Sequence, residues 1–148
     1  MLFAQAVFAF VALPGIVAIA IPLWLAPEGA PFNMWGFLPL ATGLILLLWC
    51  VRDFYVAGRG TLAPWTPPRH LVQVGLYRFS RNPMYVAVLL MLVGWAIGFR
   101  TGSLWNYALM IAVVFYVRVV FFEEPWLART HGEDFVRYKA RVPRWLVV

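Results

Sequence analysis

The amino-acid sequence predicts an all-α fold, an integral membrane bundle of four transmembrane helices followed by a C-terminal interfacial amphipathic helix. The first observation is composition: the 148 residues are 64% hydrophobic and 12% charged, with a mean hydropathy of +0.80. Soluble domains are about half apolar and about a quarter charged. The second observation is that four stretches, of 27, 23, 18 and 17 residues, carry no charge. Water-soluble and disordered classes are therefore excluded.

The uncharged stretches place the spans at about residues 2–25, 33–51, 84–99 and 103–122. A helix needs about 20 mostly apolar residues to cross the hydrocarbon core. The first two stretches have this length, and Phe121 and Phe122 extend the fourth. The first stretch lacks a basic start and is longer than the apolar part of a signal peptide, so we interpret it as a retained span. Pro14 inside it predicts a kink that neighbouring helices can accommodate.

The distribution of Lys and Arg predicts that both termini face the cytoplasm. An even number of spans puts both termini on one side, and that side carries eleven of the twelve basic residues, all except Arg100. We expect an integral protein of the bacterial inner membrane or an equivalent membrane. The net charge of +6 then needs no nucleic-acid partner, and it also favours anionic lipid heads.

Two cytoplasmic segments, the loop 52–83 and the tail 123–148, are predicted to form the functional site of a single membrane domain, 1–148. Long ordered connections are usually functional, and the prolines between residues 64 and 68 predict an extended middle for the loop. The tail interleaves aromatic and basic residues, which predicts an interfacial helix with its apolar side toward lipid or protein. Glu133, four residues before Arg137, is expected to support that helix.

Residues Gly58–Ala63 match the pattern GxGxxA, but a membrane helix precedes them and Pro64 follows. A dinucleotide-binding fold needs a strand before the pattern and a helix after it, so we reject that interpretation. Gly58 and Gly60 can still let the backbone approach a ligand closely. The alternative is a flexible turn leaving the second span.

The run Arg81-Asn82-Pro83-Met84-Tyr85 opens the third span. Proline in the first turn starts a helix at little cost, and the unbonded amides of that turn attract anions. This is a candidate ligand site. The alternative is an ordinary helix start with an aromatic residue at headgroup level.

Glu123-Glu124-Pro125 closes the fourth span. Neighbouring residues on a helix point about 100° apart, so both acids cannot serve one ligand equally. We expect one of them to pair with Arg118 or Arg81, which leaves the other for a cationic group. The alternative is that both acids form salt bridges at the helix end.

The sequence gives little support for a metal site, a catalytic nucleophile or a proton-coupled transporter. The chain has one cysteine, Cys50, and two histidines, His70 and His131, without the spacing of a metal site or a catalytic triad. Gly132 after His131 indicates a turn. The spans hold acids only at their ends, which weakens a proton-coupled transporter interpretation.

The order of these motifs resembles the small integral-membrane methyltransferases, which include isoprenylcysteine carboxyl methyltransferases and phospholipid N-methyltransferases. The resemblance covers about residues 50–145. It is carried by Gly75-x-Tyr77, the run 81–85, two tightly linked helices, Glu123-Glu124, Gly132 to Tyr138, and Val142-Pro143-Arg144. The runs 82–85, 94–97 and 123–125 resemble the phosphatidylethanolamine methyltransferase branch. The tail resembles the prenylcysteine branch, which has His at the position of Asn82.

The resemblance implies S-adenosylmethionine (SAM) as the methyl donor and a membrane lipid as the acceptor. A glutamate suits the ammonium of SAM, Arg81 or the amides near Pro83 suit its carboxylate, and aromatic residues suit its adenine or sulfonium. The cofactor-binding residues would be Gly58, Gly60, Tyr77, Arg81, Asn82, Pro83, Tyr85, Glu123 and Glu124.

The acceptor could be an amine or a carboxylate head. An amine must lose a proton before it attacks, and Glu124, Tyr85 and His70 are the candidate bases. A carboxylate instead needs cationic partners, and the candidate substrate-binding residues are Arg78, Arg118, Tyr138 and Arg141. The runs 82–85 and 123–125 favour an amine-headed phospholipid. The alternative from another class is a non-catalytic four-helix assembly or lipid-binding protein.

Overall fold

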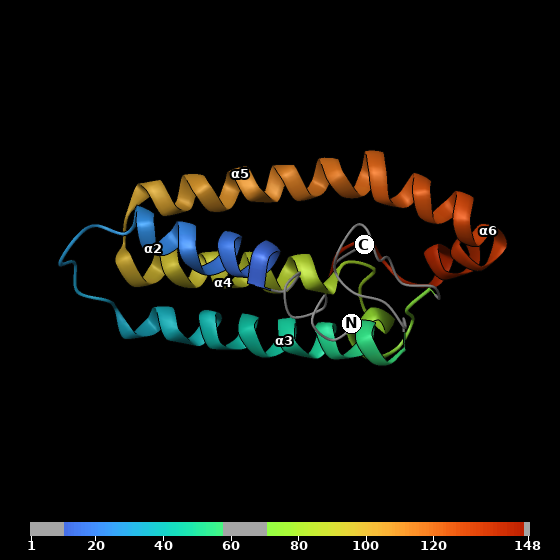
Figure 1. Ribbon diagram of the computed structural model, residues 1–148, viewed down its shortest axis with the longest axis horizontal. Helices are drawn as coiled ribbons and strands as arrows, with labels where there is room; N and C mark the ends of the chain where they lie inside the picture. The colour runs from blue at the N-terminus through green and yellow to red at the C-terminus, as the bar shows by residue number, and fades with distance from the viewer. Residues whose placement is uncertain (1–10, 58–70, 147–148) are drawn as a thin grey trace.

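The computed structural model describes residues 11–57 and 71–146, and its helices run the length of an elongated bundle (Figure 1). The described residues form helices and no strand, which confirms the all-α prediction. In chain order the elements are η1 (Val11–Ala20), α2 (Ile21–Leu25), η2 (Met34–Gly36), α3 (Phe37–Val56), η3 (Gly75–Arg78), α4 (Pro83–Phe99), α5 (Gly102–Arg118), η4 (Val119–Glu123) and α6 (Glu124–Arg141).

Four apolar helical segments lie side by side and alternate in direction (Figure 1). The first consists of η1 and α2 together, and the others are α3, α4 and α5. α4 is the central element, since it contacts α3, α5 and η1. The turn after α4 uses Arg100 in the left-handed conformation, with φ of 52°. At the other end of the bundle lie η3, the start of α4, and α6. The described part of the loop 52–83 and the tail therefore meet at one end of the bundle. That they form a functional site stays a prediction.

Two helical stretches are long and apolar enough to cross a membrane, Met34–Phe54 and Gly102–Arg141. The apolar helices Pro14–Leu25 and Pro83–Phe99 are shorter. A 17-residue helix such as α4 rises roughly 25 Å, less than the ~30 Å of hydrocarbon. Two of the four predicted spans thus have spanning length, and crossing by the other two stays a prediction.

α3 and α4 approach closely because small residues face each other along their contact. A Cβ on Gly36 would lie 2.6 Å from the Gly94 carbonyl oxygen, and one on Gly43 would lie 2.6 Å from the Ala87 carbonyl oxygen. A Cβ on Gly94 would lie 2.7 Å from the Leu40 amide nitrogen. Small residues allow this backbone-to-backbone packing in membrane helices.

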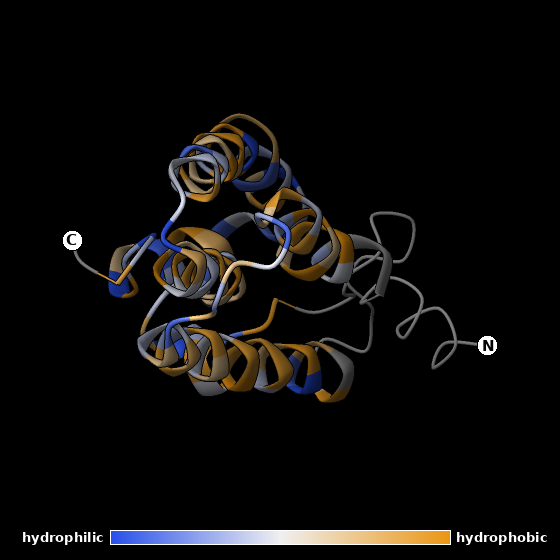
Figure 2. Cartoon of the chain, turned by 90° about the vertical axis from the view of Figure 1, so that its left-hand side faces the viewer, coloured by the Kyte–Doolittle hydropathy of each residue, from blue (hydrophilic) through white to orange (hydrophobic). Residues whose placement is uncertain are grey.

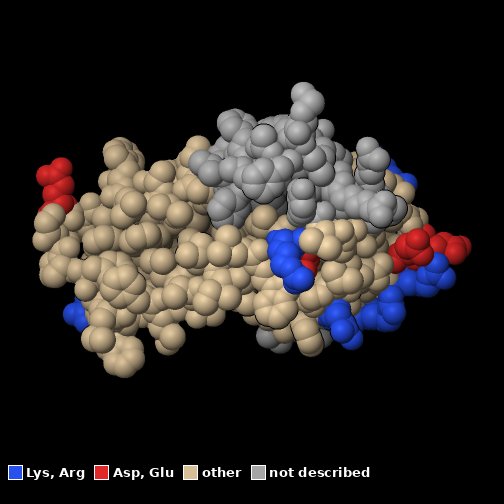
Figure 3. Space-filling model, turned by 60° about the horizontal axis from the view of Figure 1, so that its bottom comes forward, with Lys and Arg blue, Asp and Glu red and all other residues tan. Residues whose placement is uncertain are grey.

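The outer faces of the helices are apolar. Leu38, Ile45, Leu109 and Phe121 are each more than 60% exposed, and Figure 2, a view along the bundle, shows hydrophobic residues on outward sides of the helices. Figure 3 shows charged side chains at the two ends of the visible face, most of them at the end that carries α6, with a broad uncharged region between. The apolar belt agrees with a membrane environment.

The tail is helical, as expected, and departs from the expectation at one ion pair. Its helix is continuous with α5 through the π-helical η4 and breaks at Gly132, whose φ is 49°. Its apolar side faces the protein, because Phe135 and Tyr138 are buried against Leu71, Leu127 and Val142. Arg137 pairs with Asp134 at 2.7 Å rather than with Glu133, since a three-residue spacing also brings side chains together.

Candidate functional site

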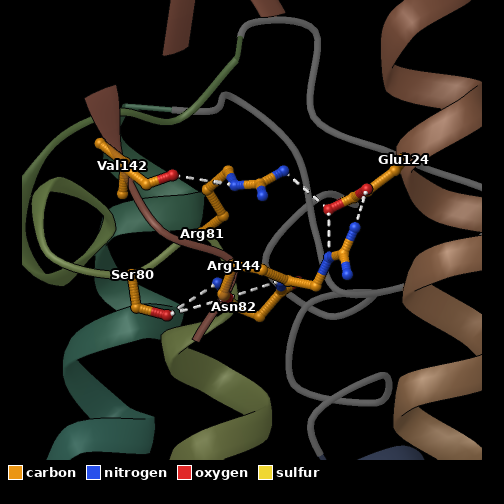
Figure 4. A network of polar contacts seen from close by, with 6 residues as sticks. All are labelled: Ser80, Arg81, Asn82, Glu124, Val142 and Arg144. Atoms are coloured by element: carbon orange, nitrogen blue, oxygen red, sulfur yellow. Dashed lines mark hydrogen bonds and ion pairs between the residues drawn. The ribbon is translucent and has the colours of Figure 1, made fainter. Parts of the chain in front are cut away.

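Glu124 joins three segments that are distant in the sequence (Figure 4). Arg81 Nη1 donates to Glu124 Oε1 at 2.7 Å, and Arg144 donates to both carboxylate oxygens at 2.8 and 2.9 Å. Arg81 Nε also donates to the Val142 carbonyl oxygen at 3.0 Å. A bidentate arginine–carboxylate pair is among the stronger polar contacts. Glu124 therefore holds the start of α4, the start of α6 and the C-terminal tail together.

We call the network of Arg81, Glu124 and Arg144 the clasp, and neighbouring polar contacts link the same three segments. The Asn82 side-chain amide donates to the Arg144 carbonyl oxygen at 3.0 Å, and the Ser80 hydroxyl donates to the same oxygen at 3.3 Å (Figure 4). The backbone N–H of Arg81 donates to the Pro143 carbonyl oxygen at 2.9 Å. Arg81, Asn82 and Glu124 thus contact the protein itself, and their predicted roles toward a cofactor stay predictions.

The charge state of Glu124 follows from this setting. Burial by itself raises the pKa of a carboxyl group, but the hydrogen bond from Arg144 and the charges of Arg81 and Arg144 outweigh it, so the pKa of Glu124 lies below its ordinary value. Glu124 is therefore an ionised group with two cationic partners. Both carboxylate oxygens of Glu124 accept hydrogen bonds from arginines, so protonation of either oxygen would disrupt these contacts and Glu124 is a weak proton acceptor.

Glu123 belongs to a separate cluster with Tyr85 and Arg118. Arg118 Nε lies 2.7 Å from Glu123 Oε1 and 3.1 Å from the Tyr85 hydroxyl, and that hydroxyl donates to Glu123 Oε1. The ring of Tyr85 packs against Phe115, with centroids 4.4 Å apart. The Glu123 side chain is 30% exposed. A carboxylate, a phenol and a guanidinium therefore converge where α4 meets the end of α5.

The two adjacent glutamates serve different partners, as the helix geometry predicted. Glu124 faces Arg81 and Glu123 faces Arg118, so both acids form ion pairs at the helix end, which was the alternative, and neither is left unpaired as we expected. Of the two acids, Glu123 is the more exposed, since the Glu124 side chain is only 12% exposed. Glu123 is the better placed of the two to meet a ligand.

The remaining predicted residues are spread around this end of the bundle. Tyr77 is buried, and its carbonyl oxygen accepts a 2.7 Å hydrogen bond from the Tyr138 hydroxyl, so both tyrosines support the fold. Arg78 is exposed, and Arg141 is an exposed partner of Gln73 at 3.4 Å. Pro83 is buried at the first position of α4. Gly58, Gly60 and His70 lie outside the described residues.

Two residues of this region were missed by sequence reasoning. Arg144 belongs to one of the motifs that carry the family resemblance, but no role was assigned to it. Its pairing with Glu124 crosses twenty residues and a kink in the helix, and no local sequence pattern indicates such a contact. Asp53 is buried near the end of α3. Its signal in the sequence was available, because it is an acid two residues past an uncharged span. Within residues 11–57 and 71–146 no cluster of metal-ligating side chains occurs.

Comparison with known families decides the class. A family model described as phospholipid methyltransferase matches residues 32–134, more than half of the chain. The chain belongs to the phospholipid methyltransferase family. Neither a curated protein nor a solved structure matched it. The family match begins just before η2 and ends within α6, so it includes both Glu123 and Glu124 and stops before Arg144.

Proposed function

We propose that this family member is a SAM-dependent N-methyltransferase that acts on the amine head of a membrane phospholipid. The observation that carries the proposal is the Tyr85–Glu123–Arg118 cluster, a partly exposed carboxylate beside a phenol at the end of the apolar belt. An ammonium head at neutral pH has no free electron pair, so its methylation requires a proton acceptor. Glu123 lies at the end of the apolar helix, where lipid headgroups meet the boundary of the belt.

The roles divide along the two clusters. Glu123 accepts the proton of the amine head, and the Tyr85 hydroxyl, bonded to the same carboxylate, orients it. Arg118 holds the carboxylate in place. Glu124, neutralised by Arg81 and Arg144, positions the start of α4 against the tail. We assign Glu124 this positioning role in preference to that of the base.

The residues fit a SAM site in their chemistry. When bound, SAM supplies an electrophilic methyl group on a sulfonium. The end of the bundle that carries α6 offers carboxylates for an ammonium, arginines for a carboxylate, and exposed aromatic rings such as Trp126 for adenine or a sulfonium. The chain's contribution is to orient the two reactants and to exclude water, because the transfer is an in-line displacement.

Carboxyl O-methylation is the less favoured alternative. It needs free cations for a carboxylate, but Arg118 is engaged by Glu123 and Arg81 by Glu124. The Asn82 side-chain amide already donates a hydrogen bond to the Arg144 carbonyl oxygen. Arg78 and Arg141 remain as exposed cations for that chemistry.

The test is to incubate the purified protein with labelled SAM and vesicles that contain either phosphatidylethanolamine or a prenylcysteine lipid. We expect label in the amine lipid. We further expect Glu123→Gln to lower kcat by roughly 100-fold or more, the usual contribution of a general base. Glu133→Gln, a change at an exposed acid of α6, is the matched control and should keep full activity.

Three results would contradict the proposal. Label confined to the prenylcysteine lipid would favour the carboxyl alternative, and a Glu123→Gln protein with full activity would remove Glu123 as the base. A folded protein whose thermal stability does not rise at millimolar SAM would favour a non-catalytic membrane protein, because binding to the folded state must stabilise it.

A further inference from the structure

Asp53 is a buried acid that neither the fold nor the proposed base accounts for. It lies in the last turn of α3 and is 6% exposed. Its Oδ2 has no hydrogen-bond donor in the part of the chain that the structure describes. Its Oδ1 is 3.9 Å from Arg52 Nη1, but that arginine is 73% exposed, so the pairing is weak. Buried carboxylates are normally paired, because burying an uncompensated charge is costly.

The chain leaves room for this carboxylate by placing a glycine opposite it. Gly75 has a φ of 57°, which L side chains rarely adopt, and a Cβ there would lie 2.0 Å from Asp53 Oδ2. The same point is 3.1 Å from Trp49 Nε1. The start of η3 therefore packs its bare backbone against the acid.

Aromatic and apolar groups surround the same end of α3. The rings of Phe54 and Tyr77 have centroids 5.3 Å apart, and Tyr77 packs with the buried Cys50 and Val72. A carboxylate among aromatic rings is the chemistry that recognises an alkylammonium group, since the carboxylate offers charge and the ring faces attract cations.

We propose that Asp53 binds the alkylammonium group of a ligand of the methyl-transfer site. This rests on the proposed function, which supplies two such groups, the amine of the lipid head and the amino group of SAM. Asp53 lies at the end of the bundle that also holds the clusters of Glu123 and Glu124 (Figure 1). A metal ion is a poorer occupant, because the described residues gather no second and third ligand around this acid.

The proposal has a consequence for the ligand-free protein. An unpaired buried charge destabilises the fold, and binding sites commonly carry such costs. The neutral, nearly isosteric Asp53→Asn should therefore fold with a Tm no lower than that of the wild type. A Tm several degrees lower without ligand would show that the carboxylate has a structural partner, and would overturn the proposal.

Ligand binding is then measured on the full-length protein in detergent, with Asp134→Asn as the matched control at an exposed acid. The probes are SAM, 5′-methylthioadenosine, which lacks the amino-acid part of SAM, and phosphatidylethanolamine vesicles. If the cofactor is the source, Asp53→Asn weakens SAM binding roughly 10- to 100-fold, as expected for a charge-assisted hydrogen bond, and leaves 5′-methylthioadenosine binding unchanged. If the lipid is the source, SAM binding is kept and the KM for phosphatidylethanolamine rises by a similar factor.

Unchanged SAM binding together with an unchanged KM would overturn the inference. Its failure is distinguishable from failure of the proposed function. Should the wild type methylate no amine lipid, an Asp53-dependent binding of SAM would still support the cofactor source, and binding independent of Asp53 would overturn the inference as well.

Discussion

At the scale of single residues, two adjacent glutamates have different partners because a helix turns about 100° per residue. Glu124 points into the contact between α4 and the tail, and Glu123 points toward Tyr85 and Arg118. The break in regular α-helical bonding at η4 ends at Glu123, the first residue of this pair. π-helical turns of this kind often occur at functional sites.

Glu124→Gln tests the clasp. The amide cannot neutralise Arg81, whose side chain is 9% exposed, so an uncompensated charge remains partly buried. We expect the free energy of unfolding to fall by about 2–3 kcal/mol, toward the low end for removing one partner of a buried pair. The measurement is thermal or denaturant unfolding in detergent. Asp134→Asn breaks an exposed pair and should cost less than ~0.5 kcal/mol; equal losses in the two variants would show that the clasp is no stronger than a surface ion pair.

The pH dependence of stability should carry the signature of Glu124. Its pKa is depressed in the folded state, so the stability it contributes is present above the ordinary value of 4.5 and is lost as the pH falls through the folded value. The difference in Tm between wild type and Glu124→Gln should therefore be largest near pH 7 and shrink below pH ~4.5. A difference that grows toward acid pH would contradict the assignment.

Single residues also show where prediction from the sequence stops. Pairing of one glutamate with Arg118 or Arg81 was predictable, because a charge near the membrane boundary needs a partner and few were available. That both glutamates would be paired was not predicted. The choice of which glutamate takes which arginine depends on the three-dimensional direction of each side chain. Arg144 reaches Glu124 only because the chain reverses at Gly132.

At the scale of elements, the contact between α3 and α4 depends on glycines where each backbone touches its neighbour. Gly94→Leu would place a side chain 2.7 Å from the Leu40 amide nitrogen. We expect the helices to separate and the Tm in detergent to fall by roughly 10 °C or more, as for a strongly overpacked core. Gly102→Ala is the matched control, because nothing lies within 4 Å of its Cβ position. A Tm unchanged by Gly94→Leu would show that the close approach is dispensable.

The helices themselves were the most predictable elements. Uncharged stretches located α4 and α5 to within a few residues, since a charge inside hydrocarbon is costly. α3 runs on to Val56, five residues past the predicted end, because Arg52 and Asp53 are compatible with a helix outside the hydrocarbon. The apolar side of α6 could have faced lipid or protein, and only packing against Leu71 and Leu127 decides for protein.

At the scale of the whole molecule, charge is divided along the bundle axis. Nine of the twelve basic residues lie at one end of the bundle, in segments at or beyond the ends of α3 and α5 or at the start of α4. Two more, Arg59 and Arg69, lie outside the described residues, and Arg100 is alone at the opposite end. The lengths of the uncharged stretches predicted this division. These lengths could not predict that the acids at this end lie in three different settings: the Glu123 cluster, the Glu124 clasp and the buried site of Asp53.

We propose that the end with α6 faces the cytoplasm, in accord with the positive-inside rule. Labelling with a membrane-impermeant maleimide tests this, and the chain suits the method because its one cysteine, Cys50, is buried. Glu133→Cys on α6 and Glu28→Cys in the loop before α3 both replace exposed residues. In sealed inside-out vesicles we expect Glu133→Cys to be labelled and Glu28→Cys to be protected, and the reverse in right-side-out vesicles. The four-span topology puts three spans between these two positions. Labelling of both positions from one side would mean that an even number of spans separates them, and the four-span topology would be wrong.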